Sequence, residues 1–355
     1  MNKIFRILSI VFILSLTGCN PSDEPKAAPL RDYQEQYAKD LANIEEFLKT
    51  HSYQAVSNPG GTDDQNVTFT EVPLNDPTAI WNSPDLVKDF TVDRQADHEV
   101  TYTLYYLKLR EGGGASGDKG QPTNVDAILA AYQGSYLFEY FDPTSGDRSL
   151  RYQLFESNPF PQSNLNLEGV IRGWSEIFPQ FRPGDYHDNE GEPTTYTDFG
   201  AGIMFLPSGL AYYNQAPTAA AIPQYSPLIF TFKLYEVIRL DQDQDGIPSY
   251  LEDLDGDRYM RIIAEGVNPD DTDGDKAPDY LDLDDDGDFV LTRIETQRPM
   301  IDPDDENEVK TYYPFNGAAT DDPSTPYDDT KGIPNCSGDF YTPNRLRKYR
   351  DPLCQ

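Results

Sequence analysis

The sequence predicts an α+β protein in which antiparallel strands surround one short helix, with another helix before this domain and a loop-rich acidic region after it. Two patterns lead to this class. Runs of β-branched and aromatic residues recur between 95 and 240 and enclose a single helical segment. After residue 240 the composition changes abruptly, because 241–288 contains sixteen Asp and only three basic residues.

The charge of the chain excludes several classes of function. Its 355 residues include 28 Lys and Arg against 61 Asp and Glu, a formal net charge of −33. A surface of this sign argues against a nucleic-acid partner and against docking on anionic lipid through a basic patch. The chain has three His, three Cys and no H-E-x-x-H, C-x-x-C or G-x-S-x-G motif, which disfavours zinc hydrolases, thioredoxin-like enzymes and α/β-hydrolases.

The N-terminus has the pattern of an export signal over residues 1–18. Two basic residues precede an apolar run over 7–16, which is too short to cross a bilayer as a helix. The segment from Leu16 to Cys19 resembles the bacterial lipobox, which implies that Cys19 carries lipid and anchors the chain in a membrane. Because Asn20 is not the Asp that marks inner-membrane retention, we expect an outer-membrane lipoprotein of the cell envelope, on its periplasmic or surface face.

A tether and a helix precede the sheet domain. Residues 19–30 are polar and Pro-rich and form the tether, and 31–94 holds the helix, followed by loops with short strands. Apolar residues recur at three- and four-residue steps from 32 to 51, which predicts an amphipathic helix with Asp32 as its N-cap. These apolar residues are Tyr33, Tyr37, Leu41, Ile44 and Leu48.

Five strand signals and one helix signal define the domain over 95–240. The strands are predicted at 100–109, 125–131, 150–155, 200–206 and 228–238. The helix is predicted at 171–181, between the third and fourth strands. Several strands around one helix indicate an antiparallel α+β domain.

Three segments of this domain, in order, resemble an FKBP-type peptidyl-prolyl cis-trans isomerase over 120–238. They are Tyr132-Gln-Gly with Phe141-Asp142, then Val170-Ile-Arg-Gly-Trp174, then Leu206-Pro-Ser-Gly-Leu-Ala-Tyr212 with Ile222-Pro223 and Leu228-Ile-Phe230. The first segment alone carries little information, whereas the second and third at this spacing are specific. The resemblance implies a twisted sheet wrapped on a short helix, with a pocket between them.

The resemblance also implies the residues of the pocket. Trp174 would form the floor, the Ile171 backbone N–H would bind the substrate carbonyl, and the Tyr212 phenol would donate at the rim. The chain departs from the family at Tyr213, where glycine is usual, and near 163–165, where an aromatic residue is missing. The residues implied for the pocket are Tyr132, Phe141, Asp142, Val170, Ile171, Trp174, Tyr212, Ile222 and Phe230.

Such a pocket needs no nucleophile and no cofactor for catalysis. Rotation about a prolyl bond faces a barrier of about 18–20 kcal/mol, because amide resonance must be broken. A dry aromatic pocket favours the twisted amide over the planar one. We therefore expect an exported isomerase that acts on proline-containing polypeptide clients and assists the folding of envelope or secreted proteins. The alternative is a calcium-dependent surface adhesion or chaperone protein that keeps the fold as an inactive scaffold.

The acidic region over 241–296 carries the spacing of calcium loops. Carboxylates at positions one, three and five, a backbone carbonyl at seven and an acid at twelve let oxygens converge on a hard cation. The array resembles thrombospondin-type-3, dockerin-like and EF-hand-like repeats, which implies structural Ca²⁺; a solvated acidic linker is the alternative. The expected ligands are Asp241, Asp243, Asp245, Ile247 and Glu252, then Asp271, Asp273, Asp275 and Asp282, then Asp284, Asp286, Asp288 and Glu295. Asp253-Leu-Asp255-Gly-Asp257 matches only in part, because it lacks the closing acid.

The tail over 297–355 is rich in Pro, Asp and Tyr and is expected to be loop. Lipidation of Cys19 would leave Cys336 and Cys354 as a pair in an oxidising compartment. We therefore expect a disulfide that closes this tail, with two free thiols as the alternative.

Overall fold

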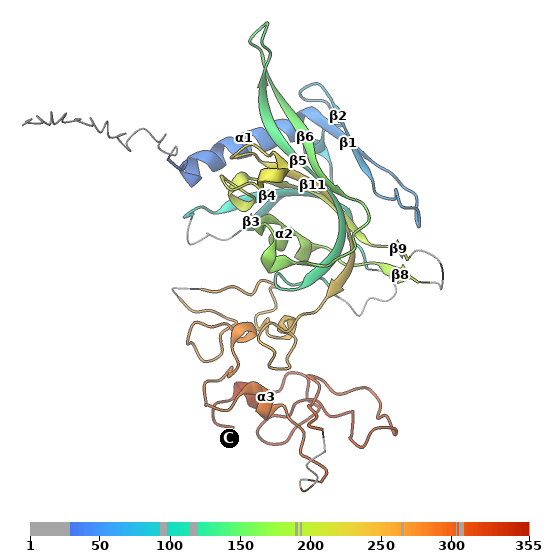
Figure 1. The fold of residues 1–355 in the computed structure, drawn as a ribbon, viewed down its shortest axis with the longest axis vertical. Coiled ribbons are helices and arrows are strands. Elements are labelled where there is room, and N and C mark those ends of the chain that lie inside the picture. Colours follow the sequence, from blue (N-terminus) through green and yellow to red (C-terminus); the bar gives the residue numbers. More distant parts are fainter. Residues whose placement is uncertain are drawn as a thin grey trace, which may run out of the picture. The chain divides into compact units, whose positions relative to one another are not determined.

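The computed structural model describes residues 29–92, 98–113, 120–188, 191, 194–263, 266–302, 304 and 309–354 (Figure 1). The export signal predicted over 1–18 and the lipidation site predicted at Cys19 lie outside these residues. The chain from Asp32 onward forms one unit by its internal contacts. Within the described ranges, no helix is long and apolar enough to span a membrane.

The N-terminal helix α1 covers Tyr33–Thr50 and confirms the helix predicted there. Asp32 caps it, because its side-chain oxygen accepts the backbone N–H of Glu35 at 2.9 Å. The chain then forms an antiparallel pair of β1, His51–Ala55, and β2, Val67–Glu71.

The central sheet has the strand order β3-β4-β10-β11-β5-β6, and each neighbouring pair is antiparallel. The predicted antiparallel α+β class is therefore confirmed, with β10 and β11 at the predicted bounds and β5 much longer than predicted. The strands are β3 Leu86–Val92, β4 Tyr102–Arg110, β5 Ala127–Phe141, β6 Arg148–Asn158, β10 Gly200–Leu206 and β11 Leu228–Ile238. The short β7, Leu165–Asn166, pairs with β5, and β8, Asp185–His187, pairs with β9, Thr195–Thr197.

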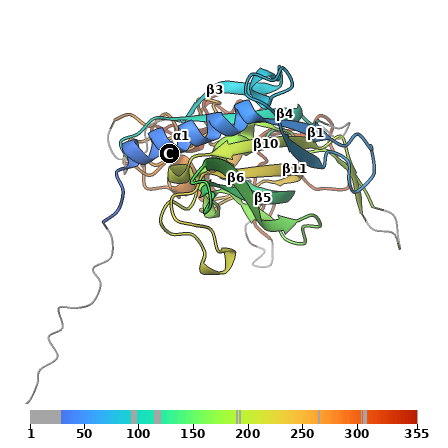
Figure 2. The ribbon, with the colours of Figure 1, turned by 90° about the horizontal axis from the view of Figure 1, so that it is seen from above.

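Helices cover both faces of this sheet. On β10, Met204 and Leu206 belong to the apolar cluster that includes Trp174 and Ile177 of α2, Arg172–Ile177. Ile203 and Phe205 belong to the cluster that includes Ile44, Phe47 and Leu48 of α1. Because both faces are buried, the central strands are almost continuously apolar instead of alternating. Figure 1 shows the sheet curving over α2, and Figure 2 shows α1, in blue, against the sheet from above.

The acidic region consists of loops joined by short helical turns and packs on the segments around α2. The Tyr259 phenol donates to the backbone oxygen of Glu176 at 2.7 Å and accepts from the Gln180 amide at 2.8 Å. The Tyr280 phenol donates to the Glu168 carboxylate at 3.2 Å. The turns are the 3-10 helices η6 Ser249–Leu251 and η7 Asp279–Leu281 and the helix α3 Thr292–Glu295.

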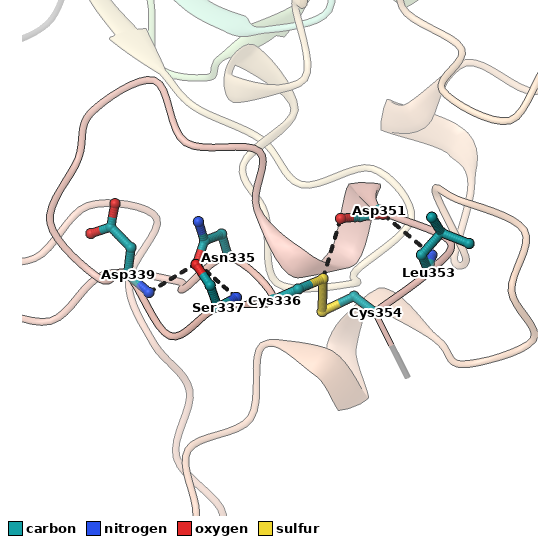
Figure 3. Close-up of a disulfide and its surroundings, with 7 residues drawn as sticks. All are labelled: Asn335, Cys336, Ser337, Asp339, Asp351, Leu353 and Cys354. Carbon is teal, nitrogen blue, oxygen red and sulfur yellow. Dashed lines mark hydrogen bonds between the residues drawn. A yellow bond between two sulfur atoms is a disulfide. The ribbon is translucent and has the colours of Figure 1, made fainter.

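The C-terminal tail returns to the first acidic loop. Ile333 and Tyr349 are buried together with Ile247 of that loop. Cys336 and Cys354 form a disulfide in the structure, with their Cα atoms 5.3 Å apart (Figure 3). The tail thus packs as a closed segment against the acidic region.

Candidate functional site

A pocket of about 370 Å³ lies between α2 and the sheet. It is lined by residues of β5, β6, β7 and β11, of α2 and the segment before it, and of the loop after β10. The structure brings Tyr132, Val170, Ile171, Trp174, Tyr212 and Phe230 together there, as the sequence predicts. The other lining residues are Glu156, Leu165 and Gly169.

Trp174 forms the inner wall of this pocket. It is only 3% exposed, and its ring meets Tyr132 at a centroid distance of 4.8 Å and Phe230 at 5.1 Å, both nearly at right angles. Its position is fixed by the start of α2, where the Trp174 N–H donates to the Ile171 carbonyl at 3.0 Å. Edge-to-face rings of this kind hold a rigid apolar cavity.

Two hydrogen-bond donors at the pocket are available to bind a ligand. Within the described part of the chain, neither the Ile171 N–H nor the Tyr212 phenol has a recorded hydrogen-bond partner. Burial raises the pKa of Tyr212, and the nearby Glu156 carboxylate raises it further, so this phenol keeps its proton at neutral pH. The Tyr132 phenol is occupied, because it donates to Glu156 at 2.9 Å.

The placement of Phe141 and Asp142 in the pocket is wrong. Phe141 ends β5 at the far end of the β5–β6 hairpin and is 59% exposed. Asp142 shapes the hairpin turn, where the backbone N–H groups of Ser145 and Thr144 donate to its carboxylate and lower its pKa. Phe141 lies nine positions after Tyr132 on the same strand, about 30 Å away at ~3.3 Å per residue.

Another aromatic-acid pair, Phe155 and Glu156 of β6, lies at the pocket instead: Glu156 lines the cavity, and Phe155 packs on the lining residue Phe230. The Phe155 ring lies edge-on to Phe230 with centroids 5.8 Å apart. A bulge makes this possible, because Gly134 pairs with Glu156 while Ser135 pairs with Leu154, which leaves Phe155 as the extra residue. Gly134 is required as well, since a Cβ there would come within 2.6 Å of both rings. The sequence carried this signal as an aromatic-acid pair fifteen positions before Val170.

Three further expectations about the pocket concern Ile222, Tyr213 and the wall near 163–165. Ile222 is buried in the core cluster of Trp174 but does not line the cavity. Tyr213 does not crowd the pocket, because its backbone takes a φ of 50° and its ring stacks on Tyr33 of α1 at 4.2 Å. Leu165 supplies the wall for which the sequence showed no aromatic residue.

Helix α1 holds the loop that carries Tyr212. The buried Asp40 carboxylate accepts the Ser208 N–H at 2.7 Å and the Gln36 amide at 2.6 Å. Desolvation raises the pKa of Asp40 to about 6, against the opposing effect of these hydrogen bonds. No local pattern in the sequence indicates this link between α1 and the pocket, because Asp40 and Ser208 lie 168 residues apart.

A second candidate site lies in the acidic region. The structure gathers carboxylates in each of the three predicted loops, with one oxygen of each residue within 4.8 Å of the others. Burial raises the pKa of Glu295 to about 8 and also raises that of Asp282. The negative charges of the third group raise the pKa of Glu295 further, and those of the second group raise that of Asp282 further. The three groups are Asp241, Asp243 and Asp245, then Asp271, Asp273 and Asp275, then Asp284, Asp286 and Asp288.

Two further groupings combine different loops. Glu252, the predicted closing acid of the first loop, lies with Asp245 and with Asp285, a residue for which the sequence suggested no role. Asp253 and Asp255 belong to the segment that matches the calcium-loop spacing only in part. Asp270, from beyond that segment, places a carboxylate oxygen within 4.8 Å of theirs. The spacing of residues along the sequence predicts only ligands within one loop. It therefore did not predict Asp285 and Asp270, which belong to other parts of the chain.

Three buried carboxylates in and beside the first loop are only partly compensated by the residues that the structure describes. Burial, with smaller effects from neighbouring acids, raises the pKa of Glu252 to about 11, of Asp285 to about 10 and of Asp245 to about 8. Both oxygens of Glu252 are buried and have no hydrogen-bond partner among the described residues. Oxygen donors in this number and charge fit Ca²⁺, which takes six to eight of them.

Comparisons with known proteins give limited matches. A family model described as "BamM C-terminal" matches residues 242–327, less than half of the chain. No curated protein matches. Among solved structures, a peptidyl-prolyl cis-trans isomerase from Pseudomonas syringae pv. tomato is 14% identical over 60% of this chain and 100% of that chain, with a TM-score of 0.30.

Two further structures are similar at the same level. FkpA from Escherichia coli is 18% identical over 58% of this chain and 61% of that chain, with a TM-score of 0.29. The N-terminal domain of FKBP42 from Arabidopsis thaliana is 12% identical over 42% of this chain and 94% of that chain, with a TM-score of 0.27.

Proposed function

We propose that this chain is an FKBP-type peptidyl-prolyl cis-trans isomerase. The observation that carries the proposal is the cavity in which the rings of Tyr132 and Phe230 stand edge-on to Trp174. An apolar cavity of this size accepts a prolyl ring. The Ile171 N–H, which has no acceptor among the described residues, would bind a carbonyl of the same peptide.

The proposed mechanism uses binding alone. The planar amide is stabilised by resonance and by hydration of its carbonyl, whereas the twisted amide has lost most of that resonance. The pocket lowers the barrier to rotation in two ways: it excludes water from the planar amide, and it binds the twisted amide at Trp174, Ile171 and Tyr212. No proton transfer is needed, which agrees with a pocket whose one acid, Glu156, is engaged by Tyr132.

A prolyl-peptide isomerisation assay tests the proposal. Tyr212→Phe removes only the phenol O–H and should lower kcat/KM by about 3- to 10-fold, the worth of one hydrogen bond of about 0.5–1.5 kcal/mol. Tyr186→Phe is the matched control, because Tyr186 is exposed on β8 outside the pocket. Equal rates for wild type and Tyr212→Phe would remove Tyr212 from the mechanism.

We propose that the protein works in the cell envelope, anchored by lipid on Cys19. The lipobox-like sequence from Leu16 to Cys19 supports the anchor, and the match of 242–327 to the BamM C-terminal family is consistent with an outer-membrane-related protein. Its clients would be proline-containing envelope or secreted polypeptides. In cells, Cys19→Ser should abolish palmitate labelling and move the protein from the membrane to the soluble fraction.

Binding of Ca²⁺ by the acidic region is a second proposed property. The buried, unpartnered carboxylate oxygens of the first and third loops support it, because ions left uncompensated in a protein interior cost several kcal/mol each. The cation would be structural and would hold the loops on the isomerase domain. If the isomerase assay fails while Ca²⁺ still binds, the calcium-dependent adhesion or chaperone scaffold becomes the better interpretation.

A further inference from the structure

The carboxylate of Asp285 is an unexplained buried acid. It is 1% exposed and stands at the second position of the third loop, where the repeat pattern calls for no ligand. Thr292 holds one of its oxygens, Oδ1, through a hydroxyl hydrogen bond of 2.9 Å. The other oxygen, Oδ2, is buried and has no hydrogen-bond partner in the part of the chain that the structure describes.

The neighbouring Asp279 shows how the same region satisfies a buried acid when no ligand is needed. Asp279 is equally buried, yet Thr272 donates to both of its oxygens, at 2.7 and 2.6 Å. Arg350 also approaches it at 3.9 Å. Asp285 is not compensated in this way, so its open oxygen requires another explanation.

The Asp285 carboxylate lies beside two acids of the first loop. Asp245, Glu252 and Asp285 each place a carboxylate oxygen within 4.8 Å of the other two, and Asp245 also belongs to the group of Asp241 and Asp243. Six buried oxygens of these two overlapping groups have no hydrogen-bond partner among the described residues: Asp241 Oδ1, Asp243 Oδ2, Asp245 Oδ2, Glu252 Oε1, Glu252 Oε2 and Asp285 Oδ2. Their number falls within the six to eight oxygens that a Ca²⁺ ion takes.

We propose that Asp285 is a ligand of the cation bound by the 241–252 loop, so that one divalent ion joins the first loop to the third. This inference rests on the proposed calcium binding. It assigns the first site a ligand from more than thirty residues beyond its own loop. The first site therefore forms only when the third loop is folded against it, and its occupation orders both loops together.

Calcium titration of the full chain tests the assignment. Asp285→Asn should weaken binding at one site by about tenfold or more, whereas Asp322→Asn, which removes an exposed acid of the tail, should not change it. Without Ca²⁺, Asp285→Asn should unfold at the same temperature as wild type or higher, because the buried amide is neutral without having to take up a proton; with Ca²⁺ it should unfold at a lower temperature than wild type. A merely structural role would lower both temperatures and would overturn the proposal.

A double-mutant cycle identifies which loop Asp285 serves. Its effect should be strongly non-additive with Glu252→Gln, the closing acid of the first loop, and additive with Glu295→Gln, the closing acid of the third. The reverse result, or unchanged affinity in Asp285→Asn, would overturn the assignment and leave the proposed calcium binding intact. If the wild-type chain binds no Ca²⁺ at all, the proposed calcium binding itself fails and the inference with it.

Discussion

Asp40 of α1 accepts two hydrogen bonds from Ser208, one from its backbone N–H at 2.7 Å and one from its hydroxyl at 2.5 Å. Ser208 begins the 3-10 helix η4, Ser208–Leu210, which leads directly to Tyr212 at the pocket. A helix that precedes the FKBP-like segment thus positions the loop that brings a proposed donor to the substrate.

Loosening this link should impair the pocket without removing any group that lines it. We expect Asp40→Asn to lower kcat/KM of prolyl isomerisation several-fold, because an amide cannot accept from both Ser208 and Gln36. Hydrogen exchange at the Ser208 and Tyr213 amides should accelerate in the same variant. Glu35→Gln, an exposed acid on the same helix, serves as control; an equal loss there would point to α1 stability as the cause.

The burial of Asp40 also predicts a pH dependence. The pKa of Asp40 is about 6 in the folded chain against an ordinary 3.8, so the folded state binds this proton more tightly. The protonated Asp40 side chain therefore contributes fully to stability below pH 3.8. This contribution is lost as the pH rises through 6, by about 3 kcal/mol in total. The free energy of unfolding of wild type minus that of Asp40→Asn should fall by this amount between pH 3.5 and 7.

That difference is best measured by urea unfolding at several pH values, since the many other carboxylates titrate alike in both proteins. A difference that does not change with pH would show that Asp40 keeps an ordinary pKa in the folded chain.

The corrected pocket wall gives a matched pair of substitutions. Phe155→Leu should reduce kcat/KM by tenfold or more, because Phe155 packs on Phe230 at the pocket. Phe141→Leu, which changes an exposed ring at the hairpin turn in the same way, should leave it unchanged. Circular dichroism should show both variants folded; loss of activity in Phe141→Leu alone would restore the placement that the structure rejects.

Local patterns in the sequence were sufficient for most of the fold. The apolar spacing from Tyr33 to Leu48 predicted α1, and the runs at 200–206 and 228–238 predicted β10 and β11 with their bounds. These signals are short-range, because helix and strand periodicity depends on neighbouring residues. Phe141 was misplaced because the length of the β5–β6 hairpin cannot be read from such patterns.

The contacts that complete the sites come from residues distant in sequence. Asp40 reaches Ser208 across 168 residues, and Asp285 joins Glu252 from another loop. Neither residue carries a local motif, so only the folded chain assembles them. The bulge that turns Phe155 toward Phe230 is likewise set by strand pairing rather than by its own neighbours.

Removal of calcium should destabilise the acidic region. A cation that binds the folded chain alone stabilises it by about 2.7 kcal/mol at a concentration one hundred times its Kd. We therefore expect chelation to lower the unfolding temperature and to expose 241–296 to proteolysis, and Ca²⁺ but not Mg²⁺ to reverse both. Glu252→Gln should reduce the response to Ca²⁺; identical melting with chelator and with Ca²⁺ would favour the solvated acidic linker.

The most direct test of the central claim is catalysis of a proline-limited refolding reaction by the wild-type chain. With substoichiometric amounts of the folded protein, we predict faster decay of the slow, prolyl-limited phase, with a smaller acceleration by Phe155→Leu and an unchanged one by Phe141→Leu. A slow phase that is unaffected by the folded wild-type chain at any concentration would contradict the account.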